Sequence, residues 1–391
     1  MNNKDIFLDK SIAVYGGSFS IPTMGHYHMI EKATQIFDIV YVTIAVNANK
    51  QKSDFPLEER LLMLKDMAHD IDPSDTKICI TILPEHTYLA DFAYQKGAKF
   101  LIRGIRDQID FGYEQNIYRT NKKIQSKVET IYLMPDDAYN LVSSSWIRGI
   151  IGCRGWTEVI EYSVTPFVLN SLKRQHLKKI FMDLLKQPIF LKIMRNSNES
   201  IWSVIEKAYE NNEYHGYSHL IDMLDSYDLY FPDLSMQDPI MKYAIFFHDV
   251  DSSEEKSAQI AMSNIRTVNG IGDGEDIRDK IYRLIMATKH NTCEYEKEDE
   301  KIIASLDLRI LASNRLKYNN YVGDVFSEYL RKSGKSGVEF RPTWSSERSA
   351  FLKKMLSRRV IFPWCVMDEW NPIAIENMKE ELSDLCPLEE N

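Results

Sequence analysis

The sequence predicts an α/β domain built on a doubly wound parallel sheet, followed by an all-α domain. Within the first 150 residues, short apolar runs rich in β-forming residues alternate with segments of helical period, which is typical of a parallel sheet with crossover helices. From about residue 171 these runs stop and apolar residues recur at helical spacing. A chain of 391 residues also exceeds the usual size of one hydrophobic core. We therefore expect two domains.

The β-rich runs define five expected strands, which are 12–15, 39–46, 78–82, 99–102 and 129–133. Helix-period segments such as 26–37 and 57–68 lie between them. The expected helices of the second part are 203–212, 219–229, 238–250, 277–290, 301–312 and 348–359. These patterns predict an α/β domain over 1–170, a helical junction over 171–194 and a helical domain over 195–391.

The composition argues against nucleic acid and membranes as partners. The net charge is −9 and the basic residues are scattered, which argues against a sequence-independent grip on nucleic acid but leaves small anionic ligands open. The five cysteines are far apart and form no C-x-x-C pair, so we expect reduced thiols and a cytoplasmic protein. We find no run of about 18 apolar residues and no signal-peptide core, and we expect no membrane association.

Candidate anion-binding groups follow four of the expected strands. The segment "GGSFSIPTMGH" (16–26) supplies glycines for a sharp turn, and a helix beginning at its last residue would aim free N–H groups at the same place. Lys50, Arg103, Arg106 and the serines 143–145 come after later strands. Each taken alone also has a structural explanation, such as a solvated arginine or a helix N-cap. Together they predict one phosphate-binding rim at the carboxyl ends of the strands.

The segments "YGGSFSIPTMGHYHMIEKA", "LIRGIRDQIDFGYE" and "YLMPDDAYNLVSSSWIR" resemble phosphopantetheine adenylyltransferase along about 165 residues. The T-x-G-H form of Thr23–His26 resembles this family more than the nicotinamide mononucleotide adenylyltransferases, which usually carry H-x-G-H. The resemblance implies a Rossmann-like fold, ATP with Mg²⁺, and transfer of AMP to 4′-phosphopantetheine. The products would be dephospho-CoA and pyrophosphate, with no covalent enzyme intermediate.

The same resemblance implies roles for individual residues. Catalytic roles fall on His26, Lys50, Arg103 and Ser18, with His26 expected to donate to a phosphate oxygen and not to act as a base. The implied ATP-binding residues are Gly17, Ser18, Phe19, His26, Gly104, Arg106, Glu114, Tyr139, Ser143, Ser144 and Ser145.

The chain departs from the family pattern at a few positions. Ser20 and Ile21 replace an aspartate and a proline, Lys122 replaces an arginine after Asn121, and Gly149 replaces an acidic residue. These departures bear on the acceptor and on efficiency. They keep open a related acceptor such as nicotinamide mononucleotide, or a regulatory protein that senses nucleotide or coenzyme A without turnover.

The helical part carries histidines and aspartates in suggestive positions. His215 and His219 are four apart, so on a helix they would share one face, as paired metal ligands do. His248 and Asp249 end the apolar run "AIFF", where two ionisable groups are costly unless a cation or partner compensates them. A single histidine such as His290 is more often a satisfied core residue.

The order His, His-Asp, Asp resembles the HD-domain superfamily of metal-dependent phosphohydrolases over roughly residues 195–365. The implied ligands of a divalent metal are His219, His248, Asp249 and Asp307, with His215 and His290 as second-site or substrate-side ligands. Mn, Fe, Mg, Ni and Zn all suit such ligands. Ser305 replaces an acidic residue that this branch often has. A purely structural helical domain is the alternative.

The resulting prediction is a bifunctional, cytoplasmic enzyme. It joins an adenylyltransferase acting on ATP and 4′-phosphopantetheine to a phosphohydrolase of unknown substrate. We expect a homo-oligomer that uses neither nucleic acid nor a membrane.

Overall fold

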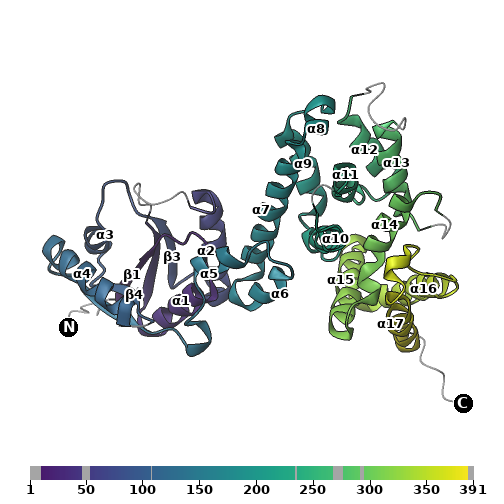
Figure 1. Ribbon diagram of the computed structural model, residues 1–391. Coiled ribbons are helices and arrows are strands. Elements are labelled where there is room, and N and C mark those ends of the chain that lie inside the picture. Colours follow the sequence, from purple (N-terminus) through teal and green to yellow (C-terminus); the bar gives the residue numbers. More distant parts are fainter. Residues whose placement is uncertain are drawn as a thin grey trace, which may run out of the picture. The chain divides into compact units, whose positions relative to one another are not determined.

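A computed structural model describes residues 10–45, 53–106, 108–233, 236–266, 276–290 and 295–385 (Figure 1). The chain divides into two compact units, Met1–Leu172 and Lys173–Asn391. The prediction of a parallel sheet followed by a helix-rich remainder is confirmed. No helix among the described residues combines the length and the hydropathy needed to cross a membrane.

The first unit is built on a five-stranded parallel sheet of order β3-β2-β1-β4-β5. Its strands are β1 (Ile12–Gly17), β2 (Ile39–Ile44), β3 (Ile78–Ile82), β4 (Phe100–Gly104) and β5 (Glu129–Leu133). Its main helices are α1 (Met24–Ile36), α2 (Leu57–Ile71), α3 (Leu89–Gln95), α4 (Gln108–Ile124), α5 (Ser144–Ile150) and α6 (Trp156–Ile160). Two short 3₁₀ helices, η1 (Asp137–Tyr139) and η2 (Glu161–Ser163), complete it.

Helices cover both faces of this sheet. Helices α1 and α2 pack on β2 and β3, whereas α3 packs on β1 and β4 from the other side (Figure 1). The central strands are buried on both faces, which explains why β1 and β2 are nearly continuous apolar runs.

The strand order reverses between β1 and β4. The chain runs outward from β1 to β3, then crosses to β4 and continues outward in the opposite direction. Loops leaving the carboxyl ends of β1 and β4 therefore diverge and open a crevice, which is where sheets of this type bind ligands.

The turn after β1 differs from its expected form. Gly16 and Gly17 lie inside the strand and not beyond it, and neither has a positive φ. The residue in the left-handed region is Phe19, with a φ of 44°, and its ring is buried. Helix α1 begins at Met24, two residues before the expected start, because Thr23 is its N-cap.

The second unit is helical, apart from an isolated antiparallel bridge between Met194 and Ile265. Its helices are α7 (Pro166–Leu185), which begins in the first unit, α8 (Pro188–Ile193), α9 (Asn198–Tyr209), α10 (Tyr217–Tyr230), α11 (Pro239–Phe247), α12 (Glu254–Ser263), α13 (Ile277–Ala287), α14 (Glu298–Asp307), α15 (Arg315–Ser333), α16 (Gly337–Leu356) and α17 (Trp370–Leu385). The 3₁₀ helices η3 (Leu308–Ala312) and η4 (Cys365–Met367) follow α14 and α16.

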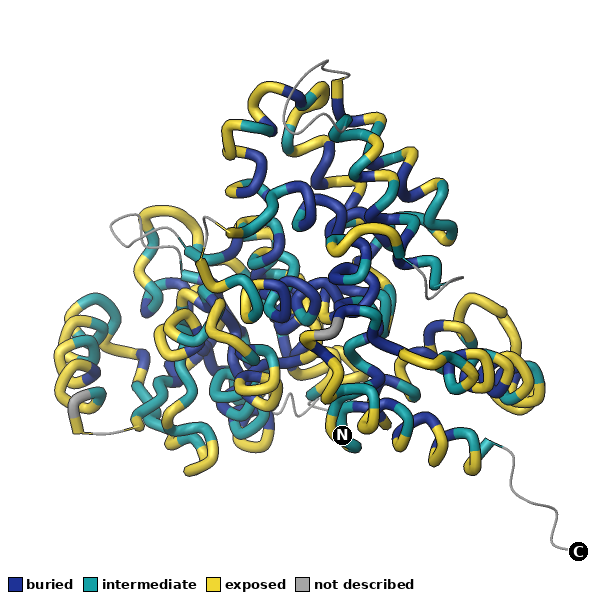
Figure 2. The backbone as a smooth tube through the Cα atoms, turned by 45° about the vertical axis from the view of Figure 1, so that its right-hand side comes forward, coloured by how far each residue is buried: buried dark blue, intermediate teal, exposed yellow. Residues whose placement is uncertain are grey.

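Helix α11 forms the centre of this unit. Seven of its nine residues are buried, and it contacts α10, α12, α13 and α14 (Figure 2). A helix that is apolar all round belongs in a core. The polar residue at its C-cap, His248, is therefore fully buried.

Candidate functional site

The crevice at the carboxyl ends of β1 and β4 contains a cavity of about 440 Å³. The candidate residues that line it are Gly17, Ser18, His26, Arg103, Gly104, Arg106, Glu114, Tyr139, Ser143, Ser144 and Ser145. Groups from three of the four predicted segments thus meet at one place, while their roles stay predictions. Lys50 lies outside the described residues, and Phe19 is not among the lining residues.

Phe19 instead packs against the ring of His26. Its ring meets the rings of Tyr15 and His26 edge to face, at centroid distances of 5.5 and 5.1 Å. A buried aromatic residue in the left-handed region is strained, and such strain is held in place only by its surroundings. Here it brings the backbone of Ser18 toward the cavity, with the Ser18 carbonyl accepting from Arg60 Nη1 at 2.6 Å.

The cap of α1 fixes the orientation and tautomer of His26. The backbone N–H of Thr23 donates to Nδ1 of His26 at 3.0 Å, so Nδ1 accepts and the ring proton resides on Nε2. Burial lowers the pKa of His26 to about 4, and the charge of Arg106 adds to this. His26 is thus a neutral donor at neutral pH.

The two candidate arginines of the cavity, Arg103 and Arg106, each have a carboxylate partner. Arg103 donates from Nε and Nη2 to Glu114 at 2.7 and 2.5 Å, and from Nη1 to the carbonyl of Gly16 at 3.1 Å. Burial disfavours its charge, but the bonds from Glu114 outweigh that effect and raise the pKa of Arg103. These bonds use three of its five N–H donors. Arg106 donates from Nε to Asp110 at 2.9 Å.

The serines 143–145 differ in the hydrogen bonds that they make. Ser143 caps α5 by accepting from the backbone N–H of Trp146 at 3.1 Å, so the structural explanation holds for this residue. Ser144 donates to the carbonyl of Ile21 at 2.9 Å, which ties the block to the turn after β1. Tyr139 stacks on His28, with centroids 4.2 Å apart.

Ser20, one of the departures from the family pattern, contacts a carboxylate. Ser20 donates to Oδ2 of Asp54 at 2.6 Å, and the same oxygen accepts from Nε of Arg148 at 3.0 Å. A carboxylate thus stands beside the cavity, supplied from the segment before α2. At Gly149 nothing lies within 4 Å of where a Cβ would be, so the absence of a side chain there has no packing cause.

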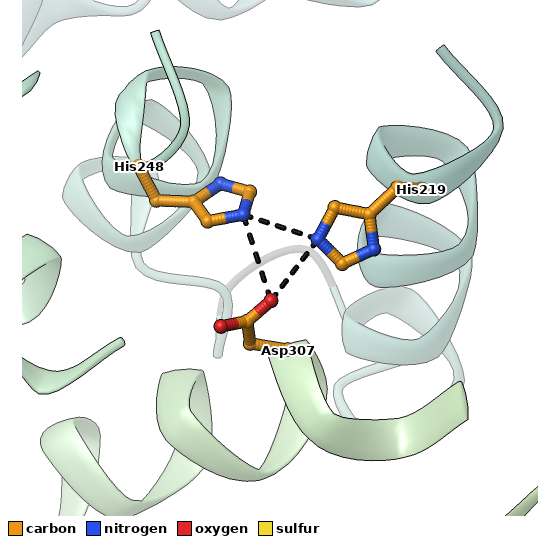
Figure 3. A group of neighbouring side chains, drawn as sticks. All are labelled: His219, His248 and Asp307. Carbon is orange, nitrogen blue, oxygen red and sulfur yellow. Dashed lines mark hydrogen bonds and ion pairs between the residues drawn. The ribbon is translucent and has the colours of Figure 1, made fainter. Parts of the chain in front are cut away.

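The second unit gathers a cluster of histidines and aspartates. His219 on α10, His248 at the end of α11 and Asp307 at the end of α14 each aim one ligand atom at a common point, and these atoms lie within 4.8 Å of one another (Figure 3). Nε2 of His219 is 3.1 Å from Nε2 of His248 and 3.0 Å from Oδ1 of Asp307. Oδ2 of Asp249 lies 3.0 Å from Nε2 of His248. We call these four residues the His/Asp cluster.

The chemistry of this cluster fits a divalent metal. Nδ1 of His248 donates to the carbonyl of Ile245 at 2.8 Å, which turns Nε2 toward the other ligand atoms. Two imidazole nitrogens and two carboxylates are thereby directed at one another in a largely buried place, and this needs a compensating positive charge. The four would suit a metal that accepts mixed N and O ligands.

The carboxylates of the cluster favour positive charge beside them: burial alone would lower the pKa of His248, but Asp249 and Asp307 outweigh it and raise that pKa well above its ordinary value. Burial alone would raise the pKa of Asp307, but hydrogen bonds from His219, His248 and His290 outweigh it and hold that pKa well below its ordinary value. The carboxylate is therefore ionised, as a metal ligand must be.

His215 and His290, the expected second-site ligands, relate to the cluster in different ways. Nε2 of His290 lies 2.8 Å from the second carboxylate oxygen of Asp307, so it orients a ligand. His215 does not share a helix face with His219, because α10 begins only at Tyr217. Its Nδ1 is 3.0 Å from Oε1 of Glu328.

The supporting roles of several residues in both sites were not predicted from the sequence. Thr23, Asp54 and Glu328 hold candidate residues in place, and Glu328 is fully buried while accepting from the backbone N–H groups of Tyr214 and His215. Glu328 lies in "FSEYL", within a segment that belongs to the HD-domain resemblance, but that resemblance assigned it no role. Ser305, the other departure, is buried and accepts from the backbone N–H of Trp364 at 3.1 Å.

Comparison with known proteins covers the first unit. Residues 14–150 match the family model described as Cytidylyltransferase-like. Phosphopantetheine adenylyltransferase of Neisseria meningitidis serogroup C is 34% identical over 164 residues, which are 42% of this chain and 93% of that protein. The enzyme of the same name from Clostridium novyi is 35% identical over 162 residues, or 41% and 96%.

Among solved structures, nicotinic acid mononucleotide adenylyltransferase of Plasmodium falciparum, complexed with APC, aligns at a TM-score of 0.33 and 18% identity. The alignment covers 44% of this chain and 98% of that one.

Proposed function

Since this chain belongs, through its N-terminal part, to the phosphopantetheine adenylyltransferase family, we propose that this part transfers AMP from ATP to 4′-phosphopantetheine. The observation that carries the proposal is the cavity at the switch point of the sheet, into which His26, Arg103 and the serine block converge. The relatives carry this activity in their name, and their match spans nearly their whole length.

In this reaction a phosphate oxygen of the acceptor attacks the α-phosphorus of ATP, and the bond from that phosphorus to the bridging oxygen of pyrophosphate breaks. The acceptor is already ionised, so no base is needed and the protein acts by positioning and by stabilising charge. The Nε2–H of His26 donates to a phosphate oxygen as negative charge develops there. Arg103 on β4 has two terminal N–H groups that the bonds described above do not use, and these donate to the same developing charge.

A turnover assay tests the proposal. The full chain with Mg²⁺, ATP and 4′-phosphopantetheine should release pyrophosphate and dephospho-CoA in equal amounts, and His26→Ala should lower kcat about 10²- to 10³-fold. His69→Ala is the matched control, because His69 is an exposed histidine of α2 outside the cavity lining and should leave kcat unchanged. Nicotinamide mononucleotide in place of phosphopantetheine tests the alternative acceptor. ATP binding without product from either acceptor would favour a nucleotide sensor.

We propose further that the second unit is a metal-dependent phosphohydrolase. The carrying observation is the convergence of His219, His248 and Asp307, with Asp249 at 3.0 Å from His248 (Figure 3). These four residues would hold the metal, and His290 would orient Asp307. A bound divalent metal supplies Lewis acidity toward a phosphate and lowers the pKa of a bound water.

The proposed reaction is hydrolysis of a phosphomonoester. The oxygen of water bonds to phosphorus, the bond from phosphorus to the ester oxygen breaks, and the alcohol leaves with a proton, giving inorganic phosphate. In this reaction the protein would hold the two histidine and two aspartate ligands of the His/Asp cluster in fixed, largely buried positions.

Metal binding is measured first, apart from turnover. The chain purified with chelator should bind about one equivalent of Mn²⁺ or Zn²⁺ in calorimetry, and His248→Ala should abolish that binding. His176→Ala serves as control, since this histidine of α7 lies outside the cluster. Mn²⁺ bound equally by the unmodified chain and by His248→Ala would refute this part of the proposal.

A further inference from the structure

Arg148 is a third arginine in the wall of the first-unit cavity. It lies on α5, the helix that begins in the serines 143–145, and its side chain is 45% exposed. Like Arg103 and Arg106 it has a carboxylate partner, since its Nε donates to Oδ2 of Asp54 at 3.0 Å. The partners of the other two arginines both come from α4, whereas Asp54 comes from the segment before α2.

Two hydrogen bonds join Asp54 to the turn after β1. The hydroxyl of Ser20 donates to Oδ2 of Asp54 at 2.6 Å, and the oxygen of that hydroxyl accepts from the backbone N–H of Asp54 at 3.0 Å. Oδ2 therefore links Ser20 to Arg148, which come from different segments and both line the cavity. Asp54 itself is 22% exposed and is not among the lining residues, so its effect on a bound ligand passes through these two side chains.

The carboxylate of Asp54 lies close to where an aspartate at position 20 would place its own. The family pattern has an aspartate at that position, and this chain has Ser20. An aspartate there would carry its carboxylate oxygens one bond beyond the present serine oxygen, which is already 2.6 Å from Oδ2 of Asp54. One negative charge is thus kept beside the cavity, but it is supplied by a different segment.

This contact orients the guanidinium group of Arg148 without using all of it. Nη1 donates to the hydroxyl of Ser145 at 3.4 Å, and Nη2 has no hydrogen-bond partner in the part of the chain that the structure describes. A guanidinium group binds phosphate oxygens through such terminal N–H groups. Without the carboxylate on Nε, this exposed side chain would populate more rotamers, and fixing it on a ligand would cost more conformational entropy.

We propose that Asp54 is a positioning residue of the adenylyl-transfer site, where it orients Arg148 toward the phosphates of ATP in place of an aspartate at position 20. The proposal rests on the adenylyltransferase function proposed above, and it identifies a residue outside the cavity wall on which ATP binding depends.

Steady-state kinetics of the full chain with Mg²⁺, ATP and 4′-phosphopantetheine test this role. Asp54→Ala should raise the KM for ATP about tenfold, while kcat and the KM for 4′-phosphopantetheine should change less than about twofold. Ser20→Asp, added to Asp54→Ala, should recover most of the loss because it returns a carboxylate to the same place. Arg148→Ala should raise the KM for ATP at least as much, and adding Asp54→Ala to it should have no further effect.

Asp38→Ala is the matched control. Asp38 makes the same pair of bonds with a serine, because its Oδ2 accepts from the hydroxyl of Ser11 at 2.7 Å and its backbone N–H donates to Oγ of Ser11 at 3.0 Å. This pair lies at the amino ends of β1 and β2, the edge of the sheet opposite the cavity. Its loss should leave both KM values unchanged.

Calorimetry of ATP binding without an acceptor separates this proposal from the reaction itself. A Kd for ATP about tenfold higher in Asp54→Ala, with no product from the unmodified chain, would uphold Asp54 as a positioning residue for ATP and refute the adenylyltransferase. Product formation with an unchanged KM for ATP in Asp54→Ala would overturn the positioning role alone, as would equal losses from Asp54→Ala in the presence and in the absence of the Arg148 side chain. Neither ATP binding nor product would overturn both.

Discussion

At the scale of single residues, both sites depend on how one hydrogen bond sets a histidine tautomer. A backbone N–H donating to Nδ1 makes His26 a donor through Nε2. In His248 the situation is reversed, because Nδ1 donates to a carbonyl, so Nε2 faces the carboxylates of the cluster and would bind a metal once its proton has left. The same side chain is thereby prepared for a phosphate oxygen in one unit and for a cation in the other.

The protonation of His26 should follow from its burial. Its pKa is lowered to about 4, whereas the unfolded chain has the ordinary value of 6.5. Between these values the unfolded chain binds a proton that the folded chain does not, so stability falls as pH drops from 6.5 toward 4 and is unaffected above 6.5. NMR of ¹³C-labelled histidine, assigned with His26→Gln, should show a neutral ring from pH 5 to 8. A midpoint near 6.5 would contradict the burial argument.

Glu114 should act as a positioning residue for Arg103. Replacing it by Gln leaves the guanidinium without its charged partner in a half-buried place, so we expect a loss of about 1 to 3 kcal/mol in the free energy of unfolding. The adenylyl-transfer rate should fall about 10- to 100-fold through kcat more than through KM, since Arg103 acts on developing charge.

Glu129→Gln gives the matched comparison. Its carboxylate pairs with Lys122 and is 54% exposed, so the change should cost less than about 1 kcal/mol and leave the rate unaltered. Equal effects of the two substitutions would refute the special role of Glu114.

At the scale of elements, helices hold the sites by pairing residues far apart in the sequence. Glu328 on α15 accepts from the segment before α10, more than 110 residues away. Burial alone would raise its pKa, but the bond from His215 outweighs burial and holds the pKa of Glu328 below its ordinary value. Arg348 on α16 and Glu381 on α17 form a second such pair, at 5% and 7% exposure.

Removal of the Glu328 charge should be costly. Glu328→Gln weakens three bonds to one buried side chain, so we expect a loss of about 2 to 4 kcal/mol in the free energy of unfolding at pH 7, measured by denaturant titration. Lys332→Met removes the exposed partner of the same carboxylate and should cost less than about 1 kcal/mol. A larger effect at Lys332 than at Glu328 would reverse our assignment of which contact matters.

At the scale of the whole molecule, the chain contains two units that each have their own core. The cavity lined by His26 and Arg103 therefore lies in the first unit and the His/Asp cluster in the second, and we expect the two units to unfold separately. A ligand that binds only the folded form of one unit stabilises it by about 2.7 kcal/mol at a concentration 100 times its Kd.

Calorimetric unfolding should resolve these effects. ATP with Mg²⁺ should raise one thermal transition by roughly 5 to 10 °C, and Mn²⁺ should raise another by a similar amount. His26→Ala should remove only the first shift and His248→Ala only the second, and EDTA added to the chain with Mn²⁺ alone should reverse the second shift. A single transition raised by both ligands, and lost in either variant, would contradict the assignment to separate units.

The sequence alone determined the order of the five strands, the change to helices after them and the identity of the chemical groups. All five strands lie within two residues of their expected bounds, because buried parallel strands are continuous apolar runs. His26, Arg103 and the His/Asp cluster were named because the motifs around them resemble those of two known families.

Only the tertiary structure decided which partners hold these groups. Asp54 reaches Ser20 across 34 residues and Glu328 reaches His215 across 113, and no local pattern encodes such pairs. The turn at Phe19 and the start of α10 at Tyr217, after His215, were likewise set by packing. Spacing along the chain specifies local conformation, whereas the distance between side chains from different elements exists only once the elements have packed.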